Sequence, residues 1–401
     1  MVWLRWTSYL ASFALPELMK HEMCPLRGIV LLLVSLSVQM LWGQAEGWLH
    51  ELDDIRNKYH AVGMEVVAMK DGEIVLDRAF GLKSREDSIP LQPGDVYRIA
   101  SVSKTFVATA IMQLVEKGKL ALDDDVNRYL GFQLRNPRFP DVPITVRMLL
   151  CHRSSLKDNL TYSHLNIIDP DANPQYADCY KDYAPGTEYA YSNLGYTLLG
   201  AVIENVSHKR FDKYIKKHIS RPLRLHGSFN VADQPSELYV NTYTYIQRKD
   251  TLQLFRPTSQ PQADALRSYR LGRSTLIFSP AGGMWISATE LATYMAMHMF
   301  GGTLGSRQVI SPHSEQQMRE IHTPEQRYAL SFRHYTNLIP GERMIGQTGG
   351  AQGIHSAMVF HPEKKFGFVV ICNGCKSGRR DGSDLSWEAV RCMYRHLIKA
   401  D

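Results

Sequence analysis

A serine and a lysine stand three residues apart where a helix is expected to begin. Ser101-Val102-Ser103-Lys104 opens a stretch rich in Ala, Met and Leu that runs to Lys117, so the Ser101 hydroxyl and the Lys104 amine should share one helix face. Serine is a poor nucleophile until a neighbouring group takes its proton, and burial can lower the pKa of a lysine far enough for it to do so. The free N–H groups at a helix start would also favour an oxyanion formed there.

Tyr191-Ser192-Asn193, the second candidate motif, comes just before an apolar stretch, Leu194–Val206, that predicts another helix. A phenol becomes a usable acid or base when an ammonium group stabilises its anion. The Asn193 amide can donate to a substrate carbonyl and accept from Lys104. The structural alternative is a tyrosine packed at a helix entrance, with Asn193 as the cap.

Gln347-Thr348-Gly349-Gly350 forms the third motif, ahead of a β-rich run at His355–Phe360. Small residues allow a substrate backbone to lie against an edge strand. The N–H of Gly350 could complete an oxyanion hole together with the N–H of Ser101. The alternative is a glycine-rich turn between two strands.

The three motifs, in this order, resemble those of the serine β-lactamase and penicillin-binding protein superfamily. Within it, the chain is similar to the branch that contains class C β-lactamases, D-Ala-D-Ala carboxypeptidases, D-aminopeptidases and esterases. The resemblance extends over nearly the whole chain after residue 45. It includes the flanking segments Arg98-Ile99-Ala100, Leu149–Leu156 and Ser279–Met284.

The resemblance implies a role for each residue of the first two motifs. Ser101 would be the acylated nucleophile. Lys104 and Tyr191 would share the general base and acid work, and Asn193 would position the substrate amide. The implied reaction has two steps, acylation of the serine and then attack of water on the acyl-enzyme.

Substrate binding is implied at Gln347, Thr348, Gly349 and Gly350, with Thr348 bonding to a substrate carboxylate or backbone. The third motif of the family usually begins with Lys or His, whereas here it begins with Gln347. A cation at this place helps to bind a carboxylate, and neutral Gln brings no charge. The departure favours a peptidase or esterase over an efficient β-lactamase, and predicts that Gln347→Lys improves turnover of carboxylate-bearing substrates.

Strand-like and helix-like patterns indicate how these motifs are positioned. Met64–Met69 and Ile74–Leu76 flank Asp71-Gly72, which predicts a tight antiparallel hairpin. Further strands are predicted at Tyr328–Tyr335, His355–Phe360 and Phe366–Cys372, and further helices at Trp48–Tyr59, Phe211–His218 and Leu385–Lys399. Strands from both ends of the chain can then pair in one antiparallel sheet, with a helical region inserted between them.

The predicted fold class is therefore α/β (α+β), a β-lactamase/transpeptidase-like fold with an antiparallel sheet flanked by helices and an inserted all-helical domain. Residues 46–100 and 325–401 form the predicted sheet domain. Residues 101–324 form the predicted, mostly helical domain, which carries the S-x-x-K and Y-x-N motifs.

Residues 1–45 are predicted to be a signal peptide with an overlong start. Ile29–Trp42 is an uncharged run of fourteen residues, shorter than the roughly 20 that a spanning helix needs. Arg27 precedes the run and Gly43-Gln44-Ala45 offers a small-residue cleavage site. The true start would lie near Met23, and the protein would be exported, to the periplasm or another extracytoplasmic space. The alternative is an uncleaved membrane anchor.

Composition excludes several other classes of protein. The 401 residues carry a net charge of +6, too small and too scattered for a nucleic-acid binder. The sequence contains no P-loop, dinucleotide fingerprint or zinc-protease motif, so neither a cofactor nor a metal is expected. Cys372 and Cys375 could form a bridge in an exported protein. His152 and His355 lie near motifs without a visible partner and are interpreted as structural.

The predicted function is that of a serine hydrolase. It would act through an acyl-enzyme at Ser101 on amide or ester bonds of small or peptidoglycan-like substrates, as a peptidase or esterase, with β-lactam hydrolysis as a further option. The alternatives are a penicillin-binding receptor that is never deacylated and a low-turnover scaffold protein with the same fold. The expected partner is a small-molecule or peptide substrate, not a nucleic acid, and the N-terminal segment is the only expected membrane contact. The sequence leaves the oligomeric state and the natural substrate open.

Overall fold

The computed structural model describes residues 47–158, 164–255, 263–351, 353–376 and 383–399. The predicted signal peptide, residues 1–45, lies outside these ranges. Residues 54–401 form one compact unit, and the features described below belong to it. The other unit, residues 1–53, contributes the first residues of helix α4 (Leu49–Lys58).

An antiparallel hairpin lies next to the centre of the sheet. It consists of β1 (Gly63–Lys70) and β2 (Glu73–Ser84). The two residues between the strands, Asp71 and Gly72, both have positive φ angles, 52° and 88°. A two-residue turn needs this conformation to match the twist of its strands, and the predicted hairpin is confirmed.

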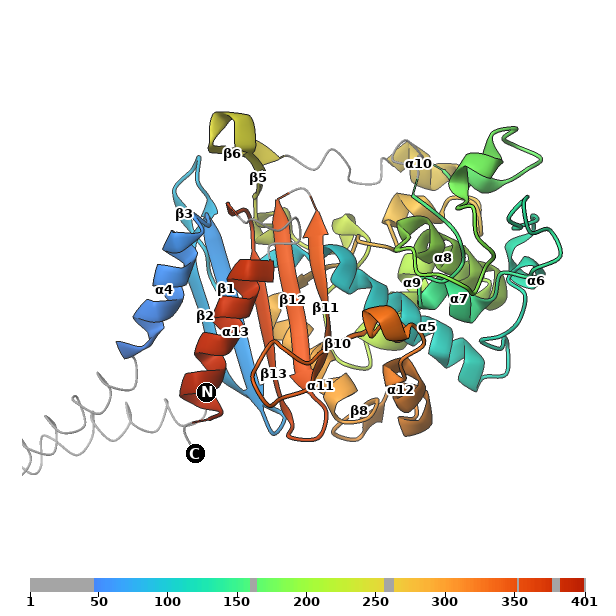
Figure 1. Ribbon diagram of the computed structural model, residues 1–401. Helices are drawn as coiled ribbons and strands as arrows, with labels where there is room; N and C mark the ends of the chain where they lie inside the picture. Colours follow the sequence, from blue (N-terminus) through green and yellow to red (C-terminus); the bar gives the residue numbers. More distant parts are fainter. Residues whose placement is uncertain (1–46, 159–163, 256–262, 352, 377–382, 400–401) are drawn as a thin grey trace, which may run out of the picture. The chain divides into compact units, whose positions relative to one another are not determined.

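Strands from both ends of the chain form one antiparallel sheet, in the order β10-β11-β12-β13-β1-β2-β3 (Figure 1). The strands not yet introduced are β3 (Ile89–Pro90), β10 (Arg333–Tyr335), β11 (Met344–Ala351), β12 (Ile354–His361) and β13 (Phe366–Cys372). The two ends meet where β1 pairs with β13 and Val67 lies opposite Val369. This pairing confirms the predicted sheet and the predicted fold class.

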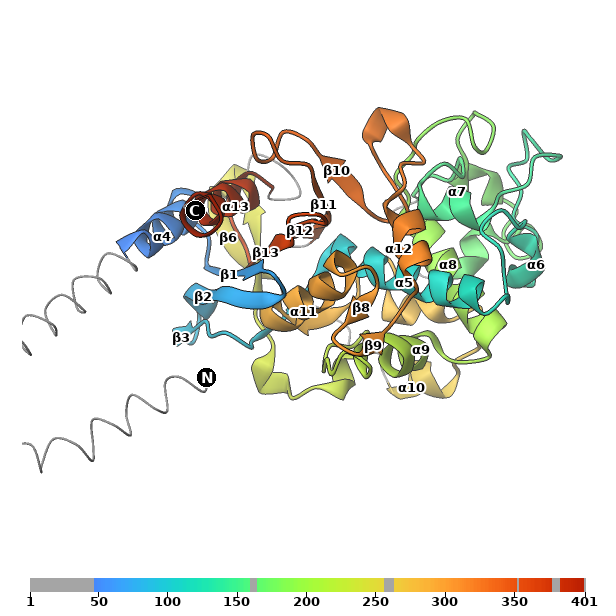
Figure 2. The ribbon, with the colours of Figure 1, turned by 90° about the horizontal axis from the view of Figure 1, so that it is seen from below.

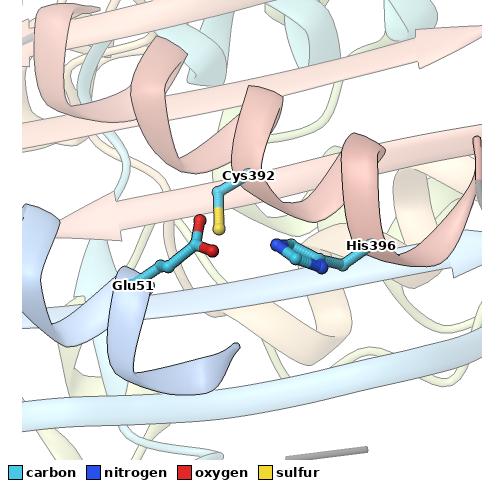
Figure 3. Close-up of side chains that lie close together, drawn as sticks. All are labelled: Glu51, Cys392 and His396. Atoms are coloured by element: carbon cyan, nitrogen blue, oxygen red, sulfur yellow. The ribbon is translucent and has the colours of Figure 1, made fainter. Parts of the chain in front are cut away.

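Helices cover both faces of this sheet. α11 (Ala288–Met299) packs against β1 and β13, while α13 (Ser383–Leu397) packs against β12 and β13 from the other side (Figure 2). Cys392 and His396 lie one helical turn apart on α13 (Figure 3). Because both faces are covered, β1, β12 and β13 are buried along almost their whole length.

The run Tyr328–Tyr335, predicted to be one strand, contains a reversal. Only Arg333–Tyr335 belongs to the sheet, as β10. Tyr328 forms an isolated bridge with Arg333, and Ser331 between them has a φ of 71°. The prediction of a single strand is wrong because an apolar, β-rich run does not reveal that the chain folds back on itself.

Two long helices, α5 (Ser103–Glu116) and α8 (Asn193–Ser207), pack against each other in the middle of the helical region. α5 is buried from Ser103 to Leu114. The remaining elements are α6 (Asn127–Leu130), α7 (Val146–Leu150), α9 (Phe211–Ile215), α10 (Ala263–Arg267), α12 (Pro312–Arg319), and the paired strands β4 (Val96–Arg98) with β7 (Trp285–Ser287), β5 (Thr242–Ile246) with β6 (Thr251–Phe255), and β8 (Thr303–Leu304) with β9 (Arg307–Gln308). The helix predicted at Leu194–Val206 is confirmed as α8.

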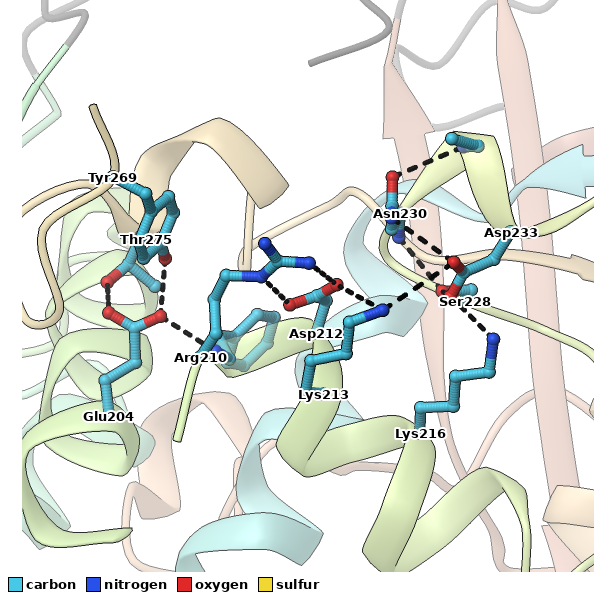
Figure 4. A network of polar contacts seen from close by, with 12 residues as sticks. Glu204, Arg210, Asp212, Lys213, Lys216, Ser228, Asn230, Asp233, Tyr269 and Thr275 are labelled. Atoms are coloured by element: carbon cyan, nitrogen blue, oxygen red, sulfur yellow. Dashed lines mark hydrogen bonds and ion pairs between the residues drawn. The ribbon is translucent and has the colours of Figure 1, made fainter. Parts of the chain in front are cut away.

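A buried carboxylate on α8 ties the helical region together (Figure 4). Oε1 of Glu204 accepts the N–H of Phe211 at 2.7 Å and the hydroxyl of Tyr269. Oε2 of Glu204 accepts the N–H of Gly272 at 2.8 Å and the hydroxyl of Thr275 at 2.7 Å. Four donors, one at the start of α9 and three within residues 269–275, therefore converge on one buried acid.

The strands of the large sheet all fall within residues 46–100 and 325–401. The exact boundaries of the sheet domain and of the helical domain, residues 101–324, stay a prediction. None of the helices in the described ranges has the length and apolar character that a membrane crossing demands. Cys372 and Cys375 are buried, and no disulfide joins them in this structure.

Candidate active site

Ser101 lies on a tight 3₁₀ turn, Ala100–Val102, directly before α5. Ala100 has a φ of 45°, a left-handed conformation that costs energy for a residue other than glycine. Ile99, the residue before Ala100, is held by two hydrogen bonds. Its N–H donates to the carbonyl of Met284 at 3.0 Å, and its carbonyl accepts from the hydroxyl of Ser356 at 2.8 Å. These contacts fix the backbone that carries the serine against β12.

Lys104 lies one turn along α5 and is completely buried. Its Nζ is 3.1 Å from Oγ of Ser101 and 2.7 Å from Oδ1 of Asn193. A third contact of 2.8 Å joins Nζ to the carbonyl oxygen of Ala281. A neutral amine has two N–H bonds and one lone pair, so the two carbonyl oxygens can take the N–H bonds while the lone pair faces the serine hydroxyl.

The surroundings of Lys104 favour the neutral amine. Burial lowers the pKa of Lys104 to about 7, the carboxylate of Asp158 raises it in part, and the guanidinium of Arg98 lowers it further. Asn193 links the two groups, since its Oδ1 contacts Nζ of Lys104 while its Nδ2 donates to the Asp158 carboxylate. Lys104 can therefore lose its proton near neutral pH, which an exposed lysine cannot do.

Tyr191 lies beside the lysine and the serine. Nζ of Lys104 is 4.9 Å from the centre of the Tyr191 ring. One flank of Tyr191 is on the surface, with 38% of the residue exposed, but protein surrounds its phenol. This burial raises the pKa of Tyr191, and a hydrogen bond with Ser101 opposes the rise in part. The phenol is thus a protonated group at neutral pH, suited to donate a hydrogen bond.

Asp158 is a residue of the site that the sequence motifs did not reveal. Its carboxylate accepts the N–H groups of Asn193 and Leu194, both at 3.0 Å, at the start of α8. It also accepts Nδ2 of Asn193 at 2.7 Å. The Asn193 amide is therefore oriented from one end by Asp158 and contacts Lys104 with the other. In a sequence, an acidic residue signals a helix cap only when it directly precedes the helix. Asp158 lies more than thirty residues before α8, so the sequence contains no such signal.

Gln347 lies on β11, and its side-chain amide is hydrogen-bonded within the protein. It is 4% exposed, and its Nε2 donates to the hydroxyl of Tyr328 at 2.8 Å. Its Oε1 accepts the N–H of Thr348 at 3.2 Å. Both ends of the amide thus have partners from this chain. The residues from Gln347 to Gly350 lie in a strand, so the alternative of a glycine-rich turn is wrong.

Gly349 brings β11 into direct contact with the serine backbone. A Cβ at this position would lie 2.4 Å from the carbonyl oxygen of Ile99 and 2.9 Å from the backbone nitrogen of Ser101. Such distances leave room only for glycine. The contact places the N–H of Ser101 beside the backbone that continues to Gly350, the arrangement an oxyanion hole requires.

The outer edge of β11 is partly unpaired in the sheet. The neighbouring strand β10 pairs only with Met344–Gly346. Within the described strands, the part of β11 from Gln347 to Ala351 pairs on one side alone, with β12. A strand edge beside a nucleophile can receive an extended substrate through backbone hydrogen bonds.

Arg333 brings a positive charge to this edge, which the motifs did not predict. It lies on β10 opposite Gly346, so its side chain and that of Thr348 share one face of the sheet. Its guanidinium is 5.9 Å from the ring centre of Tyr328, and its Nη2 donates to Oε1 of Gln326 at 3.4 Å. Its charge also acts on the phenol of Tyr191. An arginine in a strand-like run gives no signal by itself that it faces a site.

The structure brings together Ser101, Lys104, Tyr191 and Asn193, and it places Gly349 against the serine. Their catalytic and binding roles stay predictions. Around Ser101, the described residues include no group of three His, Cys, Asp or Glu side chains close enough to share a metal ion.

Comparisons with known proteins identify the family and relatives of this chain. A family model described as Beta-lactamase matches residues 46–391. Protein flp of Staphylococcus aureus is 24% identical over 79% of this chain and 60% of its own length, and Penicillin-binding protein 4* of Bacillus subtilis is 29% identical over 49% of this chain and 45% of its own. The chain thus spans about three fifths, or less, of the length of these relatives.

A solved structure supports the same fold. The octameric penicillin-binding protein homologue from Pyrococcus abyssi is 26% identical to this chain and superimposes with a TM-score of 0.69. The likeness covers 88% of this chain and 77% of that one.

Proposed function

The chain belongs to the Beta-lactamase family, and from this premise we propose that it is a serine hydrolase that forms an acyl-enzyme at Ser101. The observation that carries the proposal is the contact between Ser101 and a buried Lys104 whose pKa is lowered to about 7. The strained turn at Ala100 adds support, since such strain is retained where it serves a site.

Acylation begins with transfer of the Ser101 proton to Nζ of Lys104. The serine oxygen then attacks the carbonyl carbon of an amide or ester. The resulting oxyanion would lie between the N–H groups of Ser101 and Gly350, whose backbone positions are held by the contact at Gly349.

Collapse of the tetrahedral intermediate breaks the bond to the leaving group. The leaving nitrogen or oxygen takes a proton from the Tyr191 phenol, which Lys104 reprotonates. Water then attacks the acyl-enzyme, and its proton returns through the same lysine, so that free Ser101 and a carboxylic acid remain.

The substrate we propose is an extended amide or ester that carries a carboxylate. The open edge of β11 suits an extended backbone, and Arg333 and Thr348 on the same face suit a carboxylate. In this account Arg333 supplies the positive charge that Gln347 lacks. Small or peptidoglycan-like substrates of a peptidase or esterase fit this description, and the names of the relatives make penicillin a suitable probe.

Export from the cytoplasm is part of the proposal and rests on the sequence of residues 1–45. The expected partners stay the same, a small-molecule or peptide substrate and no nucleic acid. The receptor and scaffold alternatives differ from the hydrolase in what happens after the serine is exposed to an acylating agent.

One experiment separates these functions. The purified protein is incubated with a fluorescent penicillin and with a fluorophosphonate probe, and its intact mass is followed over time, with Ser101→Ala as the control. A fluorophosphonate adduct that is absent from the control supports the hydrolase. A penicillin adduct that persists indicates a receptor, and a transient one indicates β-lactam turnover. No adduct with either probe, in folded protein, would leave only the scaffold.

A further inference from the structure

His152, interpreted from the sequence as structural, contacts both neighbours of Tyr191. Its carbonyl accepts the N–H of Ala190 at 2.9 Å. Its side-chain Nδ1 accepts the N–H of Ser192 at 3.1 Å. The two residues on either side of Tyr191 are therefore bonded to one histidine.

The ring of His152 also packs directly on the tyrosine. The ring centres of His152 and Tyr191 are 4.2 Å apart, with an angle of 38° between the planes. The other aromatic neighbours of His152 lie further away, with Tyr328 at 5.0 Å, Tyr196 at 5.3 Å and Tyr189 at 5.8 Å. The histidine thus restrains the backbone of Tyr191 at two points and its ring at a third.

The bond to Ser192 fixes the chemical state of the imidazole. A backbone N–H can only donate, so Nδ1 of His152 must be unprotonated, and a neutral ring then carries its hydrogen on Nε2. Burial holds the pKa of His152 well below its usual value, and the charges of Lys104 and Arg333 lower it further. All of these causes disfavour the protonated ring, so the imidazole is neutral near pH 7.

The backbone of His152 is itself held in an unusual conformation. Its φ is 60°, a region that Asn, Asp and His tolerate better than other residues apart from glycine. In this conformation His152 presents both its carbonyl and its Nδ1 to the chain at Tyr191.

We propose that His152 is a positioning residue, which holds the phenol of Tyr191 against Ser101 through its bonds to Ala190 and Ser192. The inference rests on the proposed function and adds to it the group that keeps the general acid in place. His152 touches neither the serine nor the substrate in this account.

A double-mutant cycle tests the proposal. The rate of labelling by the fluorophosphonate probe, and kcat and KM for a simple ester, are measured for the wild-type protein, His152→Ala, Tyr191→Phe and the double variant. We expect His152→Ala to lower kcat about 100-fold, the scale of a misplaced acid–base group, with KM nearly unchanged. In the Tyr191→Phe background the same change should cost less than about threefold, because the group it positions is gone. An equal loss in both backgrounds would overturn the proposal.

A conservative variant provides the matched control. In His152→Asn, Oδ1 takes the place of Nδ1 as an acceptor, and asparagine tolerates the same φ. We expect it to recover at least about tenfold of the kcat that His152→Ala loses. Absence of any recovery in a folded His152→Asn protein would count against a role for the bond to Ser192.

A measurement on the wild-type protein keeps the test independent of folding of the variants. ¹⁵N NMR of the imidazole should show an unprotonated Nδ1 and a protonated Nε2 for His152 from about pH 6 to pH 8. A proton on Nδ1 would overturn the proposal. If the wild-type protein reacts with neither probe, the proposed function and this inference fail together. If it reacts and the cycle is additive, the inference alone fails.

Discussion

Two buried ionisable side chains, Lys104 on α5 and Glu204 on α8, lie in the same pair of packed helices but have very different surroundings. Glu204 receives four hydrogen bonds from N–H and O–H donors. Lys104 contacts two carbonyl oxygens and a serine hydroxyl, all of them neutral, and its pKa is lowered to about 7. The Glu204 carboxylate accepts hydrogen bonds at both oxygens, whereas the Lys104 amine lies among neutral groups that allow it to lose a proton.

The difference indicates which of the two buried ionisable side chains is catalytic and which is structural. A buried ion whose partners all stabilise the charged form contributes to the fold and is costly to replace. A buried amine whose surroundings leave it close to neutral, with its lone pair at a hydroxyl, is prepared to act as a base. Four substitutions can break or sharpen this contrast.

The largest effect is expected for Lys104→Arg. Arginine keeps the positive charge but cannot lose its proton near neutral pH, so Ser101 would have no base. We expect kcat/KM for an ester to fall at least about 1,000-fold, measured with protein whose circular dichroism matches the wild type. A variant that kept more than a tenth of the activity would show that Lys104 is not the base.

Arg333→Gln tests a cation that must stay charged, in contrast to Lys104. We expect KM for a carboxylate-bearing substrate to rise about tenfold or more, because a charged hydrogen bond to the substrate is lost. The matched neutral ester should show little change, since it makes no such contact. An equal rise in KM for both substrates would mean that Arg333 does not bind the substrate carboxylate. Gln347→Lys in the Arg333→Gln background would then show whether the family's usual position can restore binding.

Asp158→Asn should change both the rate and its pH dependence. The variant loses part of the orientation of Asn193, and kcat at the optimum should fall on the order of tenfold. The carboxylate of Asp158 raises the pKa of Lys104, so its removal should lower that pKa and extend activity to more acidic pH. Arg98, Tyr191 and His152, which also face this region, are unchanged. A pH profile that moved to higher pH would contradict the electrostatic role.

Glu204→Gln should leave the chemistry unaffected. A glutamine presents an NH₂ group to donors that have lost their acceptor, so the free energy of unfolding should fall by about 2–3 kcal/mol. Urea denaturation measures this loss, and kcat/KM per folded molecule should stay within about twofold of the wild type because Glu204 is outside the site. A large loss of activity without a loss of stability would remove the contrast with Lys104.

Local spacing predicted much of this site. The contact between Ser101 and Lys104 follows from the helical period, and the hairpin at Asp71 and Gly72 follows from turn chemistry. Asn193 was also placed correctly beside Lys104. These relations depend on a few neighbouring residues or on motifs whose order is specific.

The remaining parts of the site depend on the path of the chain in three dimensions. Asp158 reaches α8 from a distant segment, and Arg333 reaches the site only because the chain reverses after Tyr328. His152 acquires its partners in the same way. Asp158 and Arg333 are ordinary polar residues in their own segments, so no local pattern identifies them. His152 lies in Leu149–Leu156, which resembles the family, but that resemblance gives the histidine no partner and no role.

The most direct test of the central claim is the pH dependence of the rate at which a fluorophosphonate labels Ser101 in the wild-type protein, followed by intact mass. If neutral Lys104 activates the serine, the rate should rise with pH and reach half its maximum near pH 7, the pKa to which burial lowers this lysine. A rate that does not change between about pH 5 and pH 9, or an adduct on a residue other than Ser101, would contradict the account.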